Sequence, residues 1–457
     1  MAIVKLLEQQ ADLPSAESTK SYWHKEPSEA LLGHRTTQKL PSVADVVVVG
    51  SGITGAFAAR ELVNGGRSVL MLEAREACWG ATGRNGGHCQ PLVYAAKPHI
   101  SRFELDTYVF LRDLVAKHGI PCDWESVGGV HTIPDRETFD LVVKHLDCLK
   151  RDFPDLAEEA FLVTGKDELE KLRVPEAFAA VYQPSAAKLW PYKLVAWVLE
   201  CLIAEYGAER FNLQTNTPVD HLQRLADTWV LHTARGQVVA KTVVLATNAY
   251  TSRLLPKLTG LLVPVRGQVC ALKPPAGSAA LEHSHVWVAP GGDDYLVQRP
   301  TGELILGGER LSVDDGQVGV SRDDDVDATV GRQLRAAMQH AVKLKPPGEA
   351  EDATLAVAYE WTGIMGYSRD GHPWVGRVPA GLGGADGLWI SAGYTGHGMP
   401  VTARCAIAVA EEILGRSGGV VLPPEYRIDA GRAERAQGTV LPTTLLDEIR
   451  ALIVEWE

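Results

Sequence analysis

The sequence predicts an α/β protein in which a nucleotide-binding domain with a parallel sheet is interrupted by a second, α+β domain. Three observations predict this fold. A β-branched run, Asp45–Val49, leads directly into a glycine-rich turn and a helical segment, as at the start of a strand–helix–strand unit. Residues 263–310 alternate between apolar and polar side chains, which is typical of antiparallel strands. After residue 353 the pattern returns to strand, loop and long helix, so the second domain is expected to be an insertion.

The expected elements define the domain boundaries. A second buried strand, Ser68–Leu72, follows the first helix, and a third covers residues 238–246. The charged residues 135–181 have a helical pattern. We expect an N-terminal extension at residues 1–44 and a C-terminal helical tail at 431–457. The nucleotide-binding domain is expected at 45–102, 182–262 and 345–430, and the inserted domain at 103–181 and 263–344.

Composition excludes several classes of function. A chain of 457 residues is too long for one simple core. A net charge of −12 without a long basic run argues against a nucleic-acid partner. No stretch approaches the roughly 18 apolar residues of a membrane span. Seven widely spaced cysteines without a CxxC pair favour free thiols in a reducing interior, hence a cytoplasmic location and no metal site.

The first glycine-rich turn predicts a dinucleotide site. Gly50 permits the tight turn, Gly52 allows a pyrophosphate to approach the backbone, and Gly55 lets the helix pack against the strand. Glu73 ends the next strand, 23 positions after Gly50, where its carboxylate can bind ribose hydroxyls. The turn and this strand end supply the first expected cofactor residues: Gly50, Gly52, Ile53, Thr54, Gly55, Glu73, Ala74 and Arg75.

A second glycine loop, Gly80–His88, follows closely. It offers backbone amides, a hydroxyl and a guanidinium to phosphate and ring. NAD enzymes do not ordinarily carry such a loop at this place, so the loop favours FAD. Its expected cofactor residues are Ala81, Thr82, Arg84, Asn85, Gly86, Gly87 and His88.

Four blocks spread over most of the chain carry a family resemblance. They read VVVVGSGITGAFAARELV with LEAR, GATGRNGGH, TVVLATNAYTSRLLP, and WTGIMGYSRDGHPWVG followed by GLWISAGYTGHGMPVTARCAIAVAEEIL. The chain resembles the D-amino-acid oxidase-like family of FAD oxidoreductases, and its GRNGG and YTGHG motifs are most similar to the γ-glutamylputrescine oxidase branch. The resemblance implies a Rossmann-like FAD-binding domain of the glutathione-reductase type. It also implies an inserted α+β substrate domain whose mixed or antiparallel sheet covers the flavin.

The resemblance implies further cofactor residues. The last helix is expected to start near Gly398, with its N–H groups facing the flavin N1/O2 edge, where reduction places negative charge. The remaining expected cofactor residues are Val219, Thr247, Asn248, Gly363, Gly393, Tyr394, Thr395, Gly396, His397, Gly398 and Met399.

Four side chains are candidates for a catalytic role. His88 and His397 are ionisable and expected near the flavin, where either could control substrate protonation or ring electrostatics. Each could equally be a histidine that bonds only to local backbone. Tyr394 and Trp361, together with Tyr295, are candidate aromatic walls for an amine. Arg266 is expected to shape the interdomain cleft.

Three departures from relatives bear on the reaction. Met365 stands where the glycine oxidase pattern has a carboxylate-binding arginine, so a substrate without a carboxylate on its reactive carbon is expected. Gly363 stands where monomeric sarcosine oxidases attach FAD through cysteine, so non-covalent FAD is expected. Leu304–Leu306 replaces the segment with an oxygen-activating lysine, which leaves the choice between O2 and another acceptor open, with O2 preferred.

The expected function is therefore oxidation of a primary or secondary amine by hydride transfer to flavin, giving an imine that hydrolyses. One alternative is an amino-acid oxidase that holds its substrate carboxylate through Arg299 or Arg310. Another is a non-catalytic FAD-binding assembly factor. The expected partners are a small-molecule amine and an electron acceptor, with no nucleic acid and no membrane, and the protein is expected to be a monomer or homodimer.

Overall fold

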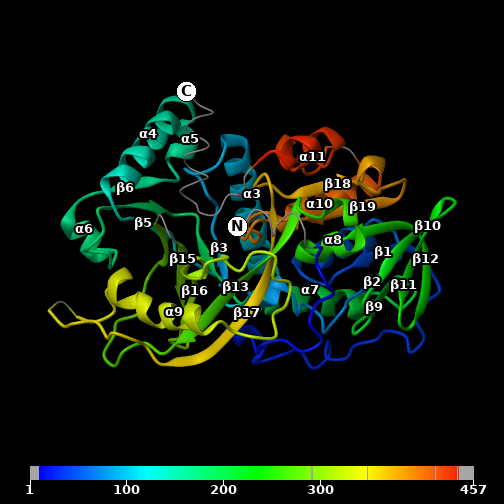
Figure 1. Ribbon diagram of the computed structural model, residues 1–457, viewed down its shortest axis with the longest axis horizontal. Coiled ribbons are helices and arrows are strands. Elements are labelled where there is room, and N and C mark those ends of the chain that lie inside the picture. Colours follow the sequence, from blue (N-terminus) through cyan, green and yellow to red (C-terminus); the bar gives the residue numbers. More distant parts are fainter. Residues whose placement is uncertain (1–9, 290–291, 347, 417, 440, 442–457) are drawn as a thin grey trace.

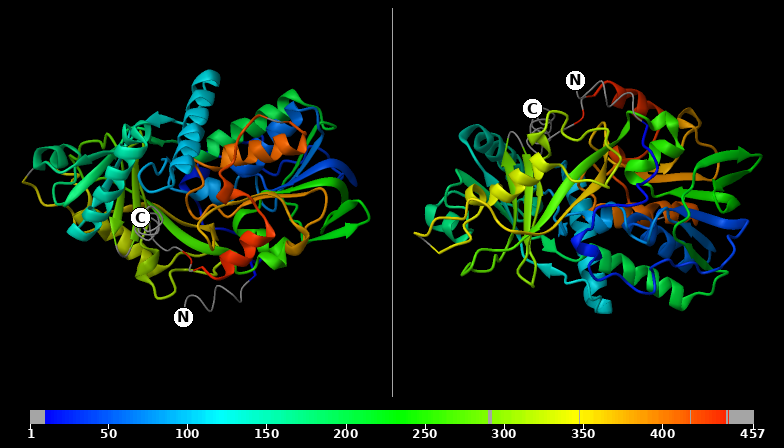
Figure 2. Two further views of the ribbon diagram at one scale, coloured as in Figure 1. Left: turned by 90° about the horizontal axis from the view of Figure 1, so that it is seen from above. Right: turned by 60° about the horizontal axis from the view of Figure 1, so that its bottom comes forward.

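The computed structural model describes residues 10–289, 292–346, 348–416, 418–439 and 441. Figure 1 shows two halves side by side: a sheet with a parallel core and its helices, and a second sheet flanked by α4 (Arg136–Asp152), α6 (Lys166–Lys171) and α9 (Ala328–Ala341). The long strands β13 and β17 lie where the two halves meet, and the views in Figure 2 show the same division. The fold is thus a Rossmann-like domain with an inserted α+β domain, as the sequence predicts.

The first sheet is built on β1, the β-branched run that the sequence marks. β1 (Val43–Val49) lies between two parallel neighbours, β2 (Val69–Leu72) and β12 (Gly236–Leu245). Residues 46–49 of β1 are buried, as expected of a strand covered on both faces. The sheet continues with β9 (Phe211–Gln214) beyond β2, with β11 (Thr228–Thr233) and β10 (His221–Leu225) beyond β12, and with β19 (Leu388–Ala392) and β18 (Trp374–Arg377) in a branch from β12.

Three helices pack together beside this sheet: α2 (Ile53–Asn64), α7 (Pro191–Glu205) and α10 (Thr402–Ile413). α2 follows β1 directly after the glycine turn, and its buried residues include Ala56, Phe57 and Leu62. α10 starts four residues later than the sequence predicted. The segment from Gly393 to Val401 is instead a series of turns, because Gly393 and Gly396 have positive φ of 81° and 77°.

The second sheet has eight strands in the order β17-β13-β16-β15-β14-β5-β7-β6. β14 and β5 are parallel and the other neighbours are antiparallel, so the sheet is mixed, as predicted. The strands are β5 (Gly129–Ile133), β6 (Phe161–Val163), β7 (Ala179–Gln183), β13 (Leu262–Leu272), β14 (Ser284–Ala289), β15 (Gly292–Gln298), β16 (Leu304–Gly308) and β17 (Val357–Ser368).

The strand β17 belongs to a different sheet from the one in which the sequence analysis expected it. β17 was placed with the first domain through its range 345–430, but it pairs along its length with β13 of the second sheet. The reason is its register: Gly363 lies opposite Gly267 and Met365 opposite Val265, which continues the antiparallel sheet. A single strand from the last third of the chain therefore brings Met365 to the border between the halves.

The remaining helices are α3 (Pro98–His118), α4 (Arg136–Asp152), α5 (Pro154–Ala157), α6 (Lys166–Lys171), α8 (Thr251–Leu254), α9 (Ala328–Ala341) and α11 (Ala430–Gln437). A small sheet joins β3 (His88–Cys89), β8 (Ala187–Lys188) and β4 (Glu125–Ser126). Of the predicted helical tail, the structure describes α11, and residues 442–457 lie outside the described residues. No helix in the described ranges is long and apolar enough to cross a membrane.

Candidate functional site

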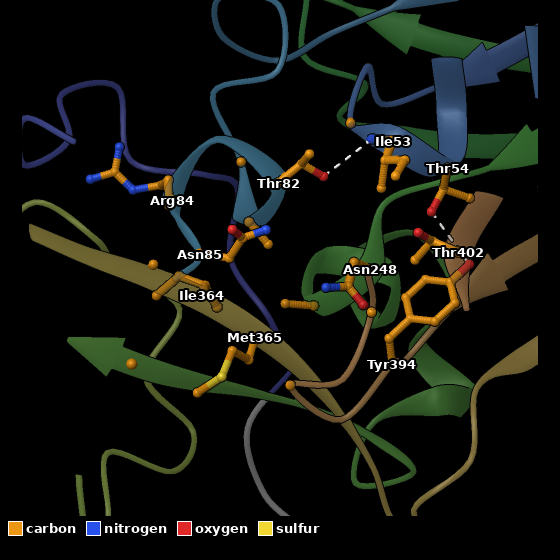
Figure 3. Close-up of a pocket in the computed structure, with 18 of the residues that line it drawn as sticks. Ile53, Thr54, Thr82, Arg84, Asn85, Asn248, Ile364, Met365, Tyr394 and Thr402 are labelled. Carbon is orange, nitrogen blue, oxygen red and sulfur yellow. Dashed lines mark hydrogen bonds between the residues drawn. The ribbon is translucent and has the colours of Figure 1, made fainter. Parts of the chain in front are cut away.

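One cavity of about 410 Å³ joins the first glycine turn to the border between the two sheets, within the usual size range of small-molecule and cofactor sites. Figure 3 shows side chains from several separate segments of the chain around it. Twenty-three of the expected residues line it: Gly50, Gly52, Ile53, Thr54, Glu73, Ala74, Arg75, Ala81, Thr82, Arg84, Asn85, Gly86, His88, Val219, Thr247, Asn248, Gly363, Tyr394, Thr395, Gly396, His397, Gly398 and Met399.

At one end of the cavity, backbone forms a cradle for phosphate. Gly50 has φ of 104°, and a Cβ on it would lie 2.5 Å from the carbonyl oxygen of Ala246. Gly52 caps α2 without any side-chain hydrogen bond, so the helix presents backbone N–H groups there. The hydroxyl of Thr82 accepts a hydrogen bond from the N–H of Ile53 at 3.1 Å (Figure 3). The two glycine loops therefore meet, and their exposed donors fit the pyrophosphate of a dinucleotide.

Glu73 stands beside this cradle, 9% exposed. Its Oε2 accepts hydrogen bonds from the backbone N–H and hydroxyl of Ser51, at 2.9 and 2.6 Å. Its Oε1 accepts one from the N–H of Arg75 at 2.9 Å. A carboxylate has about four acceptor positions, so Glu73 can both brace the first turn and bind ribose.

The loop Gly393–Met399, called the ring-facing loop because the sequence analysis expects it to face the flavin, is pinned on two sides. The side chain of Asn248 accepts a hydrogen bond from the N–H of Gly393 at 3.0 Å, and the N–H of Thr395 donates to the carbonyl of Gly366 in β17 at 2.7 Å. The Tyr394 hydroxyl lies 2.6 Å from Ser391 Oγ and accepts from Thr54 at 3.3 Å (Figure 3). Burial raises the pKa of Tyr394, so it remains a neutral phenol.

Three expected cofactor residues do not line the cavity: Gly55, Gly87 and Gly393. Their lack of a side chain serves packing instead. A Cβ on Gly55 would lie 1.9 Å from the carbonyl oxygen of Gly50, one on Gly87 2.8 Å from the Trp23 ring, and one on Gly393 2.3 Å from Leu262 Cδ2. These glycines shape the site by close approach of backbone to its neighbours.

Arg84 differs from its expected role. Its guanidinium points away from the cavity in Figure 3 and donates to the carbonyl of Thr362 at 2.6 Å and to the hydroxyl of Thr19 at 2.6 Å. Trp361 differs too, since it is fully buried and its indole N–H donates to the carbonyl of Arg84 at 2.8 Å. Both residues hold the second glycine loop against β17. Arg84 lines the cavity, but these contacts occupy its guanidinium, whereas Trp361, expected as an aromatic wall, does not line the cavity.

A buried carboxylate that sequence reasoning missed completes this framework. Asp323 is fully buried and pairs with Arg75 at 2.9 Å and Arg84 at 3.3 Å. Its carbonyl accepts from the N–H of Thr19 at 2.7 Å. The N-terminal segment, expected to be an extension of unknown role, is thereby tied to the site, and its Leu13 and Pro14 line the cavity. No local pattern in the sequence indicates that Asp323 pairs with Arg75 and Arg84, which lie more than 200 residues before it.

The side of the cavity near Tyr295 carries two imidazoles, of which His131 is buried and His88 half-buried. Burial lowers the pKa of His88 to about 4 and that of His131 to about 3, so both are neutral near pH 7. His88 lies edge-on to the Tyr295 ring, 5.3 Å between centroids. His131, with Gln90, was not among the candidate residues, and its Nδ1 lies 3.0 Å from the Tyr94 hydroxyl.

His397 has a different environment. Its Nε2 lies 2.9 Å from Oε2 of Glu104, a residue of α3 that is 3% exposed. Glu104 was not a candidate, because its position within a long helix gives no sign that it faces a loop nearly 300 residues away. His397 itself is partly open to the cavity, with 31% of its side chain exposed.

Met365 lies against the ring-facing loop, where a Cβ on Gly396 would be 3.4 Å from its sulfur. The two arginines considered as substitute carboxylate ligands have different positions. Arg299 lies outside the cavity, bound to Asp123 at 2.6 Å and packed against Trp23, so it cannot serve in that role. Arg310 lines the cavity, with its guanidinium 5.4 Å from the Tyr367 ring. Arg266 lies near this region and donates to the Gln317 side chain at 2.8 Å.

Three comparisons identify similar proteins. A family model described as FAD dependent oxidoreductase, DAO, matches residues 45–412. Gamma-glutamylputrescine oxidoreductase of Escherichia coli is 24% identical, with 87% of this chain and 90% of that protein covered. Glycine oxidase of Pseudomonas aeruginosa is 28% identical, with coverages of 85% and 99%. The crystal structure of glycine oxidase from Geobacillus kaustophilus superimposes with a TM-score of 0.69 at 20% identity, covering 85% of this chain and 99% of that one.

Proposed function

The chain belongs to the DAO family of FAD-dependent oxidoreductases, which act on amines or amino acids, and within it we propose oxidation of the C–N bond of a primary or secondary amine. The observation that supports this reaction is the continuity of the cavity. It runs from the phosphate cradle at Gly52, past the ring-facing loop, to a side lined by Met365, Tyr295 and His397. A bound dinucleotide and a small substrate can therefore meet in one enclosed space.

When bound, FAD supplies the hydride acceptor, and the chain supplies binding and orientation. The N–H groups at the start of α2 and the hydroxyl of Thr82 would hold the pyrophosphate, and Glu73 the ribose. β17 and the loop at Gly396 would hold the ring. His397 would control the protonation of the amine, since only the neutral amine can release a hydride. The resulting imine hydrolyses in water.

The cofactor is proposed to be held non-covalently. Gly363 has no side chain to bond to it, and the thiol of Cys89 is fully buried with its pKa raised by burial. Acid precipitation of the yellow protein should release all flavin into the supernatant. Colour that stays in the pellet would contradict this proposal and would direct attention to His88.

The substrate is proposed to carry no carboxylate on its reactive carbon. Met365 offers no charge at the ring-facing loop, and burying a carboxylate there without a cation would be unfavourable by several kcal/mol. Arg310 favours a second candidate within the same family, an amino-acid oxidase, because it provides one guanidinium in the same cavity. An amine with a distant acidic group satisfies both observations.

The test is flavin reduction under anaerobic conditions. Alkyl and aralkyl amines should bleach the flavin absorbance faster than glycine, sarcosine or D-alanine. Faster reduction by any of these three amino acids would favour the second candidate, and an Arg310→Gln variant should then lose that preference. Flavin that no amine or amino acid reduces would leave only a non-catalytic role. Mixing the reduced protein with air then tests O2 as acceptor, since an oxidase regains its absorbance within seconds.

A further inference from the structure

Glu104 is a buried carboxylate that no part of the cofactor site accounts for. It lies in the second turn of α3, is 3% exposed, and its Oε2 accepts a hydrogen bond from the backbone N–H of Leu92 at 2.8 Å. The same oxygen lies 2.9 Å from Nε2 of His397. Burial of a carboxylate without compensation is strongly unfavourable, so a Glu104 held at this position is best explained by the partner that it contacts.

The neighbouring charges leave His397 as the ionisable partner of Glu104. Arg404 of α10 approaches the same helix but pairs with the exposed Asp106 at 2.6 Å. His88 and His131 have pKa values lowered by burial to about 4 and about 3 and carry no charge near pH 7. The thiols of Cys89 and Cys405, both buried, have raised pKa values and stay protonated, as does the buried Tyr394 phenol. Among these groups, Glu104 is the one that offers a negative charge to His397, at 2.9 Å from Nε2.

The geometry fixes the tautomer of His397. An ionised carboxylate can only accept a hydrogen bond, so Nε2 must carry the hydrogen directed at Glu104. The other nitrogen, Nδ1, is then the one that can take up a proton. The loop that carries His397 is itself restrained, since the backbone N–H of His397 donates to the carbonyl of Tyr394 at 2.8 Å.

We propose that Glu104 is a positioning residue that makes His397 the base for the substrate ammonium group. In this step the N–H bond of the ammonium breaks and a bond between that hydrogen and Nδ1 forms. The positive charge moves from the substrate to the imidazole, where the Glu104 carboxylate offsets it. The substrate is left as the neutral amine, with no change in oxidation state. This inference rests on the proposed amine chemistry and adds a residue that neither the motifs nor the cavity lining identifies.

The pH dependence of flavin reduction tests the proposal. A Glu104→Gln variant keeps the size of the side chain, but its amide can donate to Nε2 and thereby favours the tautomer with hydrogen on Nδ1. Anaerobic reduction by an alkyl amine should then be about 100-fold slower at pH 7, at the lower end of the range of general-base effects. Near pH 10.5, where about half of a free alkyl amine is deprotonated, the variant should approach the native rate.

Asp106→Asn is the matched control. It removes a carboxylate two residues away on the same helix, from an exposed ion pair with Arg404, and should leave the rate unchanged at both pH values. A purely structural role of Glu104 predicts a deficit that persists at high pH, and that result would overturn the proposal. So would a Glu104→Gln variant with the native rate at pH 7.

A second readout separates this inference from the proposed reaction. In histidine-labelled protein, long-range ¹H–¹⁵N spectra distinguish the two tautomers, and the His397 signals are assigned by their loss in His397→Gln. The native spectrum should report hydrogen on Nε2, and Glu104→Gln should shift it toward Nδ1. Hydrogen on Nδ1 in the native protein would refute the role of Glu104. If the tautomer is as expected but no amine reduces the flavin, the proposed function fails instead.

Discussion

The two ends of the cavity are built by different means. At the phosphate end, the groups that face a ligand are mostly backbone, and the turn, the helix start and Glu73 all come from residues 50–75. At the substrate end, they are side chains from β5, β15, β17 and the loop before α10. The phosphate end is therefore a local structure that glycine spacing encodes, whereas the substrate end exists only when distant segments meet.

The largest effect is expected from Gly55→Ala at the phosphate end. The new Cβ would lie 1.9 Å from the carbonyl oxygen of Gly50, so α2 must move away from the turn that it supports. We expect purified protein without bound flavin, or no folded protein, because neither backbone segment can move without breaking the cradle. Flavin absorbance per protein and a thermal unfolding curve measure both outcomes.

Gly207→Ala is the control for that variant, since a Cβ there has no neighbour within 4 Å. It should retain full flavin content. Normal flavin binding in Gly55→Ala would show that the phosphate end does not require the close packing of α2 against the turn.

A smaller effect is expected from Glu73→Ala. Charge-assisted hydrogen bonds to the ribose are worth about 1.5–3 kcal/mol each, and the brace to Ser51 is lost with them. For the one acceptor position that Glu73 has left for the ribose, titration of the flavin-free protein with FAD should show a dissociation constant raised by about 10- to 150-fold. The rate of flavin reduction in the protein that retains FAD should change little.

Glu76→Ala provides a matched control for the same segment. Glu76 accepts a hydrogen bond from the N–H of Gly33 at 2.6 Å and one from Asn216 at 2.7 Å, but it does not line the cavity. Its loss should leave FAD affinity near the native value. Equal weakening by both variants would mean that Glu73 acts through the fold and not through the ribose.

The smallest effect is expected at the substrate end, where His131 makes the stability of the folded protein depend on pH. Burial lowers the pKa of His131 to about 3, while an unfolded histidine has a pKa of about 6.5. The unfolded chain therefore binds the proton first as the pH falls. Above pH 6.5 the neutral His131 contributes fully to the free energy of unfolding. As the pH falls toward 3, this contribution is lost by about 1.4 kcal/mol per pH unit.

Denaturant unfolding between pH 7 and pH 5 measures the slope of the unfolding free energy against pH. His131→Gln, which cannot be protonated in this range, should reduce the slope by about that amount while being less stable at pH 7. An unchanged slope would indicate that His131 is accessible to protons in the folded protein.

The sequence alone determined those strands, turns and helices that a short stretch of residues specifies. The run at Asp45–Val49, the spacing of Gly50, Gly52 and Gly55, and the position of Glu73 predicted a strand, a turn and a helix that the structure contains. The alternation in residues 263–310 predicted β13, β15 and β16 for the same reason. Successive side chains of a strand point to opposite faces of its sheet, so the pattern is visible within each segment.

Only the tertiary structure decided which distant residues meet. β17 joined the second sheet because of its pairing with β13, and α10 began at Thr402 because positive φ at Gly393 and Gly396 delays it. Arg84 turned toward Thr19 and Thr362, and Asp323 joined it, through contacts between segments that are 65 to 278 residues apart. The contact of Glu104 with His397 has the same origin. Hydrogen bonds and ion pairs of this kind depend on three-dimensional proximity, and residue type and spacing along the chain do not record it.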